Sequence, residues 1–334
     1  MKKKILVTGG SGFIGSHLIE KLIKLGHQVK TIIPYNIDNS WGWIDSFEKN
    51  LKKNLNVVTG DVCDTSLMLK ETKKIDVVFH LAALISIPYS YKSPLSYINT
   101  NILGSISALE AARINSCELF VNTSTSEVYG SAQYVPIDEK HPLNAQSPYS
   151  ASKISSDQLV LSYYKSFGTP VTILRPFNTF GPRQSMRASI STIISQVINN
   201  KNSITVGNIK TKRDFTYVDD TVMGYIKTLN NKKIIGETIN LGTGKDFSIS
   251  DTIDLIKKIN RKEYLKIHID KNRIRPKKSE VTRLISNNKK AKKLLNWSPK
   301  FVGKRGFELG LKKTSEWFSN KKNIELYKVN LYNV

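Results

Sequence analysis

The sequence predicts an α/β fold in which a doubly wound parallel sheet carries a smaller, discontinuous C-terminal lobe. Short apolar runs rich in β-branched residues recur through the first half of the chain, and helix-period segments such as 17–26 and 105–113 separate them. Six runs are predicted to be strands, at 4–9, 28–34, 55–61, 77–83, 119–124 and 171–176. Alternation of strand and helix favours a parallel sheet with helices on both faces, and burial on both faces requires near-continuous apolar strands.

The C-terminal lobe is predicted from a change of pattern after Pro176. A polar loop and a helix at 189–200 follow, and the strand-like segment 237–244 then returns to the sheet. Further helices are expected at about 250–260, 287–295 and 306–319. We therefore predict a sheet domain of residues 1–177 plus about 215–245, and a second lobe of 178–214 plus about 246–334.

The composition is that of an ordinary globular protein. Of the 334 residues, 40% are hydrophobic and 23% charged, and no apolar run approaches the roughly 18–20 residues that a membrane span needs. The basic N-terminus leads into a short apolar run without a cleavage site, so we expect a buried strand and not a signal peptide. Cys63 and Cys117 are too few and too far apart for a disulfide framework or a metal site. We expect a cytoplasmic protein without a metal.

The net charge of +24 raises the question of nucleic-acid or membrane binding. Lysine carries most of the excess, with 41 Lys against 10 Arg, whereas base reading and bidentate phosphate contacts favour arginine. The densest region, 257–322, has lysine pairs on helical segments without interleaved stacking aromatics. We expect no nucleic-acid partner and no membrane partner, and the charge favours anionic substrates.

The first strand runs into the glycine-rich segment GGSGFIGSHLIEKLI at 9–23. Gly9, Gly12 and Gly15 stand at the strand-to-helix turn, where glycine permits a tight turn, close approach of a pyrophosphate and close helix packing. The helix N-terminus adds unpaired N–H groups and a positive dipole end. A plain glycine turn is the alternative, but the strand before the segment and the helix after it favour a Rossmann dinucleotide site.

Two further positions bear on the nucleotide. Asp61 ends the third strand, where it can accept a hydrogen bond from the adenine amino group or, alternatively, cap a helix. An acidic residue about 20 positions after the glycine loop usually binds the ribose 2′-hydroxyl and selects NAD, but Pro34, Tyr35 and Asn36 occupy that place. Asn36 or Asn39 can bond either ribose form. We predict NAD as the cofactor, and NADP stays open.

Tyr149 and Lys153 lie four apart in SPYSASK and so project from one face of a helix. A free phenol has a pKa of about 10, and a neighbouring ammonium favours the phenolate. We predict that Tyr149 is the base that takes a proton from a sugar hydroxyl, and that Lys153 lowers its pKa and anchors the ribose. The alternative is that Tyr149 and Lys153 are a chance pair on an exposed helix. The position of the pair after the fifth strand of the sheet counts against this alternative.

The segment NTSTSEVYG at 122–130 ends that fifth strand. Thr125 falls where its hydroxyl can share the substrate's hydrogen bond with Tyr149. Glu127 is a carboxylate at the carboxyl edge of a parallel sheet, where ligands bind. Simple oxidation of an alcohol needs no such acid, whereas abstraction of a proton beside a ketone does. A solvated loop residue is the alternative for Glu127.

Several motifs in this order resemble the extended short-chain dehydrogenase/reductase superfamily: TGGSGFIGSH, HLAA, STSEVYG, SPYSASK and RPFNTFGPRQ. The match covers roughly residues 3–300. Thr125, Ser126 and Glu127 look like the corresponding residues of the nucleotide-sugar 4,6-dehydratases. The dTDP-glucose enzymes carry an acidic aspartate at the place of Ser126, whereas the GDP-mannose 4,6-dehydratases carry a serine, as this chain does. The strings at 39–45, 80–91 and 125–153 are most similar to the legionaminic-acid-pathway dehydratase, which implies UDP- or GDP-N-acetylglucosamine as the substrate.

The resemblance implies the members of each site. The catalytic residues are Thr125, Ser126, Glu127, Tyr149 and Lys153. Besides Tyr149 and Lys153, the cofactor contacts are Gly9, Gly12, Phe13, Ile14, Gly15, Asn36, Asp61, Val62, Leu81, Ala82 and Ala83. The substrate contacts are Ser86, Asn178, Arg183, Arg213 and Arg275. Guanidinium geometry suits Arg213 and Arg275 to a diphosphate, although each arginine alone can be a surface ion-pair residue. The sheet domain would bind the dinucleotide and the second lobe the nucleotide sugar.

The sequence thus predicts an NAD-dependent 4,6-dehydratase that converts an NDP-N-acetylhexosamine to its 4-keto-6-deoxy product for a legionaminic-type surface glycan. A 4-epimerase or a decarboxylase of a UDP-sugar is the enzyme alternative, sharing only the first step. A redox-sensing binding module is the non-enzyme alternative, and the set of Tyr149, Lys153 and Thr125 counts against it, because a sensor needs no base.

A homodimer is also expected. The helix that begins at Tyr149 presents apolar side chains around more than one face, and the segment 97–112 does likewise. On the first helix these side chains are Ile154, Leu159, Leu161 and Tyr164. Pairing of two such helices with their symmetry mates would make an isologous four-helix contact, as in relatives of the superfamily.

Overall fold

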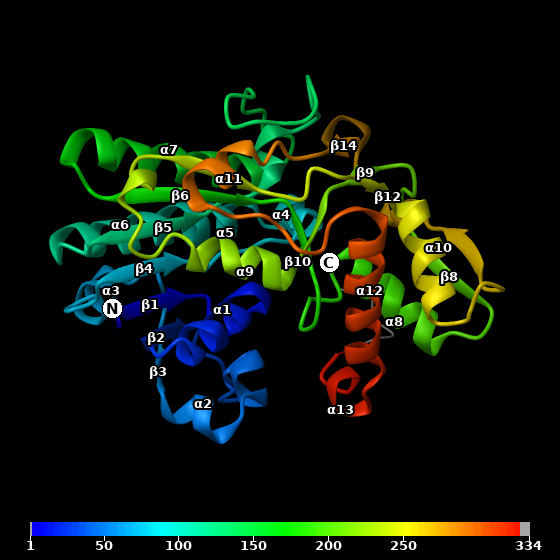
Figure 1. The fold of residues 1–334 in the computed structure, drawn as a ribbon, viewed down its shortest axis with the longest axis horizontal. Coiled ribbons are helices and arrows are strands. Elements are labelled where there is room, and N and C mark those ends of the chain that lie inside the picture. Colours follow the sequence, from blue (N-terminus) through cyan, green and yellow to red (C-terminus); the bar gives the residue numbers. More distant parts are fainter. Residues whose placement is uncertain (1, 328–334) are drawn as a thin grey trace.

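The computed structural model describes residues 2–327. Its main sheet has seven strands, all parallel, in the order β11-β6-β5-β4-β1-β2-β3 (Figure 1). The strands are β1 (Lys4–Thr8), β2 (Gln28–Ile33), β3 (Leu55–Thr59), β4 (Val77–His80), β5 (Leu119–Thr123), β6 (Val171–Pro176) and β11 (Thr238–Leu241). The predicted doubly wound α/β fold is confirmed, including the late strand that returns to the sheet.

The strand order reverses between β1 and β4, which are neighbours although β2 and β3 separate them in the sequence. The sheet continues through β2 and β3 on one side and through β5, β6 and β11 on the other. In a doubly wound sheet, ligands bind in the crevice that this switch point opens at the carboxyl ends of the strands. The functional residues are therefore expected at this edge.

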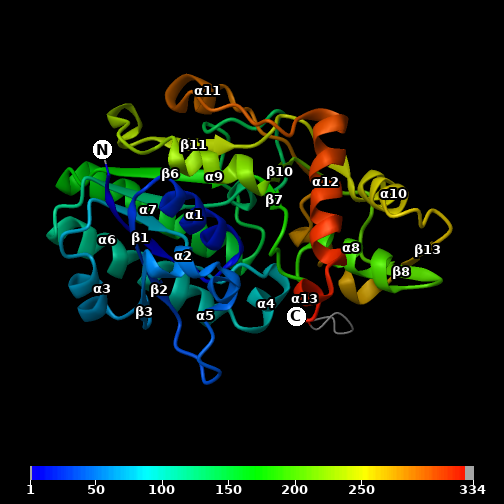
Figure 2. The same cartoon turned by 60° about the horizontal axis from the view of Figure 1, so that its bottom comes forward.

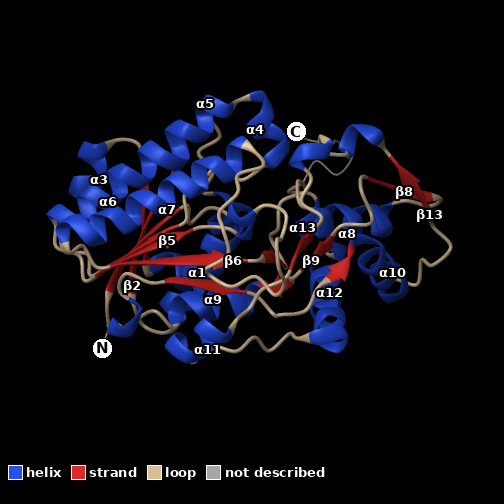
Figure 3. Cartoon of the chain, turned by 90° about the horizontal axis from the view of Figure 1, so that it is seen from above, coloured by secondary structure: helices blue, strands red, loops and turns tan. Residues whose placement is uncertain are grey.

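Helices cover both faces of the sheet (Figure 3). Those on one face are α3 (Thr65–Glu71), α6 (Gly104–Ile114) and α7 (Pro148–Phe167), and those on the other are α1 (Phe13–Lys24) and α9 (Val218–Ile226). Alternate residues of β1 serve the two faces, as the pleat of a strand requires. Ile5 and Val7 pack in the same buried cluster as Leu18 of α1, whereas Leu6 packs in the cluster that contains Ala108 of α6.

A second lobe lies beyond the carboxyl edge of the sheet, on the right in Figure 1. Its main helices are α8 (Ser189–Asn199), α10 (Ile249–Ile259) and α12 (Gly303–Ser319), and α12 stands between the sheet and the other two (Figure 2). Its small sheets are β8 (Ser203–Val206) with β13 (Lys266–Ile269), and β9 (Lys212–Arg213) with β12 (Phe247–Ser248) and β14 (Arg283–Leu284).

One short sheet joins the two predicted units. β7 (Asn178–Phe180) pairs with β10 (Phe215–Tyr217), although the sequence assigns 178 to the lobe and 215 to the sheet domain. Their aromatic side chains share one cluster, because Phe180 and Phe215 both contact Phe307 of α12. The two units are thus packed together at this point, and the domain boundaries stay a prediction.

The remaining helical segments are short. The α-helices are α2 (Lys49–Lys53), α4 (Ile87–Lys92), α5 (Pro94–Tyr97), α11 (Lys289–Leu295) and α13 (Lys321–Ile324). A π-helical segment, η2, spans Ile98–Leu103, and 3-10 turns are η1 (Gly42–Ser46), η3 (Ser126–Tyr129), η4 (Lys232–Ile234), η5 (Lys271–Arg273) and η6 (Lys277–Ser279). No helix within residues 2–327 has the length and apolar character to cross a membrane. The cytoplasmic location stays a prediction.

Candidate active site

The glycine-rich turn between β1 and α1 is shaped as a cradle. Gly9 has a φ of +72°, and a Cβ there would lie 2.7 Å from the backbone nitrogen of Ala82. A Cβ on Gly15 would lie 2.3 Å from the Gly9 carbonyl oxygen, so only glycine permits this approach of helix and loop. At Gly12 a Cβ would meet only the Gly9 oxygen, at 3.3 Å. The turn is thus closed by Gly9 and Gly15 and open at Gly12, as a bound pyrophosphate needs.

The start of α1 offers its backbone donors to such an anion. Gly12 is the N-cap residue, no side chain of the described residues caps it, and the first turn contains no acidic residue. The N–H groups of Phe13, Ile14 and Gly15 belong to this first turn, where unpaired donors and the helix dipole favour negative charge. The predicted contacts therefore fit a dinucleotide, and the fit comes from backbone geometry.

The other predicted cofactor contacts from β4 lie next to this turn. Thr8, at the end of β1, accepts hydrogen bonds through Oγ1 from the backbone N–H groups of Leu81 and Ala82, both at 3.2 Å. Asn101 then holds the backbone of Leu84 from both sides, accepting from its N–H and donating to its carbonyl. Leu81, Ala82 and Ala83 are thus fixed at the switch point between β1 and β4.

The two positions predicted to bind the adenosine part are differently placed. The Asp61 carboxylate is exposed and accepts from the N–H of Cys63 at 2.9 Å, while Asp64 caps α3. The helix-capping alternative for Asp61 is therefore wrong, because the neighbouring aspartate performs that role. Asn36 uses its amide to close its own loop: Nδ2 donates to the Ser40 carbonyl at 2.8 Å, and Oδ1 accepts from the Ser40 N–H at 2.9 Å.

Tyr149 and Lys153 lie on the buried face of α7, with 7% and 3% of their surface exposed. A capping box between Ser147 and Ser150 fixes the first turn, so the position of Tyr149 is set by local sequence. Tyr149 has a hydrogen bond with the Thr125 side chain, and the sharing of the substrate's hydrogen bond between these two residues stays a prediction. The exposed-helix alternative for this pair is wrong.

The electrostatics of this pair correct one expectation. Burial raises the pKa of Tyr149 above its ordinary value, the hydrogen bond with Thr125 lowers it, and the charge of Glu127 raises it again. Burial also lowers the pKa of Lys153 to about 8, against which the Asp157 carboxylate acts. The sequence predicts that the Lys153 ammonium lowers the phenol's pKa, but burial is the largest influence on the pKa of Tyr149 in this structure, and it acts in the opposite direction.

A buried ion pair supports α7 from behind. Asp157, one turn beyond Lys153, is paired with Arg175 of β6 at 2.9 Å, and both side chains are almost fully buried. Asp157 also accepts from Ser124 at 2.7 Å, and Arg175 donates to the Tyr129 hydroxyl at 3.0 Å. This network ties α7 to the ends of β5 and β6. Sequence reasoning missed Asp157, although its spacing of four from Lys153 was a usable signal.

Glu127 lies in η3, directly after β5, and is only 9% exposed. Arg275 approaches it, with Nη1 3.5 Å from Oε2. The reading of Glu127 as a solvated loop residue is therefore wrong. Ser126 is 2% exposed and Thr125 caps η3 by accepting from the Glu127 N–H. The carboxylate is thus held in a largely buried setting, near enough to Tyr149 for its charge to raise the phenol's pKa.

The predicted substrate contacts divide into two groups. Arg213 is buried and near enough to Glu127 and Arg275 for both to affect its pKa, which burial lowers. Asn178, which opens β7, has a buried Oδ1 without a hydrogen-bond partner among residues 2–327, the state of an acceptor that a ligand can satisfy. Ser86 stands at the N-cap position of α4 without a capping hydrogen bond from its side chain to the described residues, and its carbonyl accepts a hydrogen bond from the Tyr97 hydroxyl.

Arg183 lies apart from this group. Its guanidinium pairs with Glu20 of α1 at 2.8 Å and covers the ring of Phe47 at 5.3 Å. Its backbone has a positive φ of +67° beside a 3.0 Å contact between Pro182 and His17. The structure therefore places Arg183 in the ion pair that the sequence had left open as an alternative to substrate contact.

A family model described as GDP-mannose 4,6 dehydratase matches residues 6–310 of this chain. The chain belongs to the nucleotide-sugar dehydratase and epimerase family of the extended short-chain dehydrogenase/reductases. The resemblance that the sequence motifs indicated is thereby confirmed at the level of the family. The similarity extends through both the sheet and the second lobe.

Relatives in this family perform different reactions. Human dTDP-D-glucose 4,6-dehydratase is 32% identical over 97% of this chain and 93% of its own length. A UDP-N-acetyl-alpha-D-glucosaminuronate decarboxylase of Bacillus cytotoxicus is 32% identical over 97% of this chain and all of its own. The crystal structure of UDP-glucuronic acid 4-epimerase from Bacillus cereus, with UDP-glucuronic acid and NAD, superposes with a TM-score of 0.84, is 34% identical and covers 97% of this chain and 100% of its own.

Family membership makes the chain an enzyme of the nucleotide-sugar dehydratase and epimerase superfamily and decides against the redox-sensing binding module. NAD, the cofactor predicted from the sequence, is present in the epimerase structure. The relatives include a dehydratase, a decarboxylase and an epimerase, so family membership gives the superfamily and not the individual reaction.

The loop NSWGWID at 39–45, one of the strings that carry the resemblance, connects two parts of this family fold. The Trp43 N–H donates to the Ser11 carbonyl in the glycine turn at 3.1 Å. Its ring lies 5.5 Å from Trp317 of α12 and 5.4 Å from Tyr327. Trp43 therefore bridges the phosphate loop and the second lobe, a contact that no local pattern predicts.

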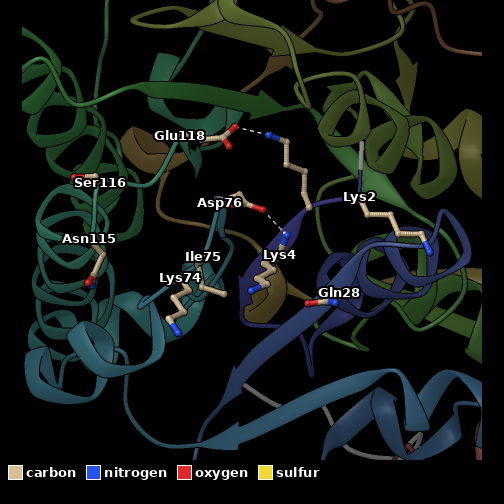
Figure 4. A pocket seen from close by; sticks show the side chains of 10 residues that line it. Lys2, Lys4, Gln28, Lys74, Ile75, Asp76, Asn115, Ser116 and Glu118 are labelled. Carbon is tan, nitrogen blue, oxygen red and sulfur yellow. Dashed lines mark hydrogen bonds and ion pairs between the residues drawn. The ribbon is translucent and has the colours of Figure 1, made fainter.

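A basic pocket lies at the other edge of the sheet (Figure 4). It is lined by Lys2, Lys3, Lys4, Gln28, Lys74, Ile75, Asp76, Asn115, Ser116 and Glu118. Lys3 pairs with Glu118, and the Lys4 N–H donates to Asp76 at 2.7 Å. Because these residues stand where β1, β2, β4 and β5 begin, the pocket is remote from the carboxyl edge and from Tyr149.

Proposed function

We propose that this enzyme is an NAD-dependent 4,6-dehydratase that converts UDP- or GDP-N-acetylglucosamine to the 4-keto-6-deoxy sugar nucleotide, for a legionaminic-type surface glycan. The observation that carries the proposal is the buried Glu127 carboxylate, close enough to Tyr149 to affect its pKa. An alcohol oxidation uses Tyr149 alone, whereas dehydration also needs a base for the C5 proton. A buried carboxylate beside the first base meets this need.

The residues divide the reaction between them. Tyr149 takes the proton of the sugar O4, with Thr125 sharing the hydrogen bond. NAD, which the glycine turn and Lys153 would hold, would supply the store for the hydride that leaves C4 and is restored at C6. The new C4 ketone acidifies the C5 proton, which Glu127 accepts. Glu127 then delivers a proton to the departing 6-hydroxyl, which leaves as water, because a serine such as Ser126 is too weak an acid to do so. When the hydride is restored at C6, Glu127 passes a proton taken from the solvent to C5, which completes the 4-keto-6-deoxy product.

The substrate would extend from this carboxylate into the second lobe. Arg213 and Arg275 supply guanidinium forks suited to a diphosphate, and Asn178 presents an unpaired acceptor. This placement supports the assignment of 178–214 and about 246–334 as the nucleotide-sugar-binding lobe, with 1–177 and about 215–245 as the dinucleotide-binding domain. Arg183 would act indirectly, by positioning α1 through Glu20.

A 4-epimerase is the second candidate, because the Bacillus cereus epimerase is similar over nearly the whole chain. One experiment separates the candidates: the purified protein is incubated with UDP- and with GDP-N-acetylglucosamine, and the product mass is measured. Loss of one water supports the dehydratase. An unchanged mass with a new chromatographic peak would favour the epimerase. A parallel incubation with the matching uronic acid tests the decarboxylase, which loss of carbon dioxide would favour.

We also propose that the enzyme is a homodimer. Large apolar side chains are exposed near α5, η2 and α7, namely Leu95, Ile98, Leu103, Tyr164 and Phe167. Ile154 and Leu161, which the sequence assigns to this contact, are partly buried against the chain's own core, so the more exposed side chains carry the proposal. Light scattering at micromolar concentration should give twice the chain mass, and Leu103→Glu should give a monomer. A wild-type monomer would contradict the proposal.

A further inference from the structure

The segment 270–280 crosses from the second lobe onto the sheet domain and carries Arg275 over the site. Hydrogen bonds hold its far end. The Tyr91 hydroxyl lies 2.5 Å from Ser279 Oγ, which donates to the Gln146 carbonyl, and Gln146 Nε2 donates to the Lys278 carbonyl at 2.8 Å. Because Lys278 and Ser279 are anchored in this way, the guanidinium three residues earlier is presented to the site.

Arg275 meets the catalytic carboxylate there with an incomplete contact. Nη1 lies 3.5 Å from Glu127 Oε2, and the two side chains are 25% and 11% exposed. Nη1 is buried and makes no hydrogen bond within residues 2–327. The pair is therefore held by charge, and a buried donor remains without an acceptor. Such a donor costs free energy until a better-placed acceptor reaches it.

A second charge pair lies alongside. The Arg213 guanidinium is 3.9 Å from Glu280, and Arg213 is also near Glu127 and Arg275, whose charges act on it. The two positive guanidinium groups and the two negative carboxylates thus lie near one another, and their charges offset. A diphosphate that enters this region would face both arginines and would compete with both carboxylates for them.

We propose that Arg275 alternates between two anionic partners, the Glu127 carboxylate and the diphosphate of the nucleotide sugar. A guanidinium can donate two parallel hydrogen bonds to a phosphate, which the contact with Glu127 does not provide. Binding of the diphosphate draws Arg275 away and leaves Glu127 free to accept the C5 proton. The coupling is reciprocal: the factor by which bound diphosphate weakens the pair of Arg275 and Glu127 is also the factor by which that pair weakens binding of the diphosphate. The inference rests on the proposed function, which assigns Glu127 as the base.

The test is a double-mutant cycle on binding of UDP and GDP, measured by calorimetry with the NAD-loaded protein. The four proteins are the wild type, Glu127→Gln, Arg275→Gln and the double variant. We expect Glu127→Gln to bind the preferred nucleotide about three- to tenfold more tightly than the wild type, although it lacks a site residue. We expect the double variant to bind as weakly as Arg275→Gln, within about twofold, because the competition needs both partners.

Two results would overturn the inference. One is an unchanged affinity in Glu127→Gln, and the other is the same gain in both backgrounds, which would show only a general loss of negative charge. Arg283→Gln, which removes a more exposed pair with Asp246, should leave the affinity within about twofold of the wild type. If Arg275→Gln lowers the melting temperature, Arg275→Lys replaces it and should retain part of the gain.

Binding of UDP or GDP by the wild type tests the proposed function, and the coupling between Glu127 and Arg275 tests the inference. A wild type that binds neither UDP nor GDP would contradict the proposed function, and the inference with it. A wild type that binds one of them without coupling between Glu127 and Arg275 would overturn the inference alone.

Discussion

The cofactor side and the substrate side of this active site consist of different kinds of chemical group. The cofactor side is mostly backbone from one continuous segment, in which Gly9 and Gly15 close a turn and the start of α1 supplies donors. The substrate side consists of charged side chains from separate parts of the chain, with Glu127 after β5, Arg213 in β9 and Arg275 in the crossing segment. The first is rigid by geometry, whereas the second depends on a balance of charges that a ligand can shift.

The largest effect should come from breaking the substrate side alone. Glu127→Gln should form product at least about 10³-fold more slowly, within the range of a positioned acid–base group. It should still oxidise C4, so reduced nicotinamide absorbance should accumulate with substrate, without loss of water and without deuterium entering C5 from heavy water. Ser126→Ala should cost only about tenfold. A serine variant as inactive as the glutamate variant would identify a serine-bound water as the acid.

Tyr149→Phe should break the step that the two sides share. The variant should fold and retain the dinucleotide, because the phosphate cradle is backbone, but turnover should fall at least about 10²-fold. Unlike Glu127→Gln, it should accumulate no reduced nicotinamide. Near-normal turnover, measured by product mass, would remove Tyr149 from the reaction.

A pair of glycine variants should sharpen the account of the cofactor side. Gly9 and Gly303 both have positive φ, +72° and +66°, but a Cβ would meet the Ala82 backbone at Gly9 and nothing within 4 Å at Gly303. Both Gly→Ala changes carry similar backbone strain, of about 1–2 kcal/mol. Only Gly9→Ala should also weaken NAD binding, by about tenfold or more, because the backbone of the glycine turn must shift to relieve the clash with Ala82. Equal NAD affinities, measured by titration, would contradict the cradle.

The smallest expected effect is a fall of kcat at high pH that the titration of Lys153 causes. Burial lowers its pKa to about 8, so the ammonium is present below pH 8 and is lost as the pH rises through that value. If the ammonium is needed, kcat should fall above pH 8, about two units earlier than for an ordinary lysine. Lys153→Arg keeps its charge and should lack this fall, although its rate should be lower. A fall near pH 8 in both proteins would assign it to another group.

Prediction from the sequence worked where structure depends on neighbours along the chain. The seven strands, the glycine turn and the spacing of Tyr149 and Lys153 all follow from local patterns with a period or a fixed order. The predicted lowering of the Tyr149 pKa is not found, because burial, which raises it, is a property of the whole fold. Asn36 closes its own loop through its amide, a contact with Ser40 that its position after the second strand does not predict.

By itself, then, the sequence determined the doubly wound sheet, the dinucleotide cradle and the identity of the chemical groups, because each is encoded within a few turns of helix or one strand-to-helix connection. Only the tertiary structure decided that Arg275 faces Glu127, that Arg183 pairs with Glu20, and that Trp43 joins the glycine turn to α12. These contacts join segments far apart in the chain. Side-chain charge and shape permit many such pairings, and the packing of the two units selects one.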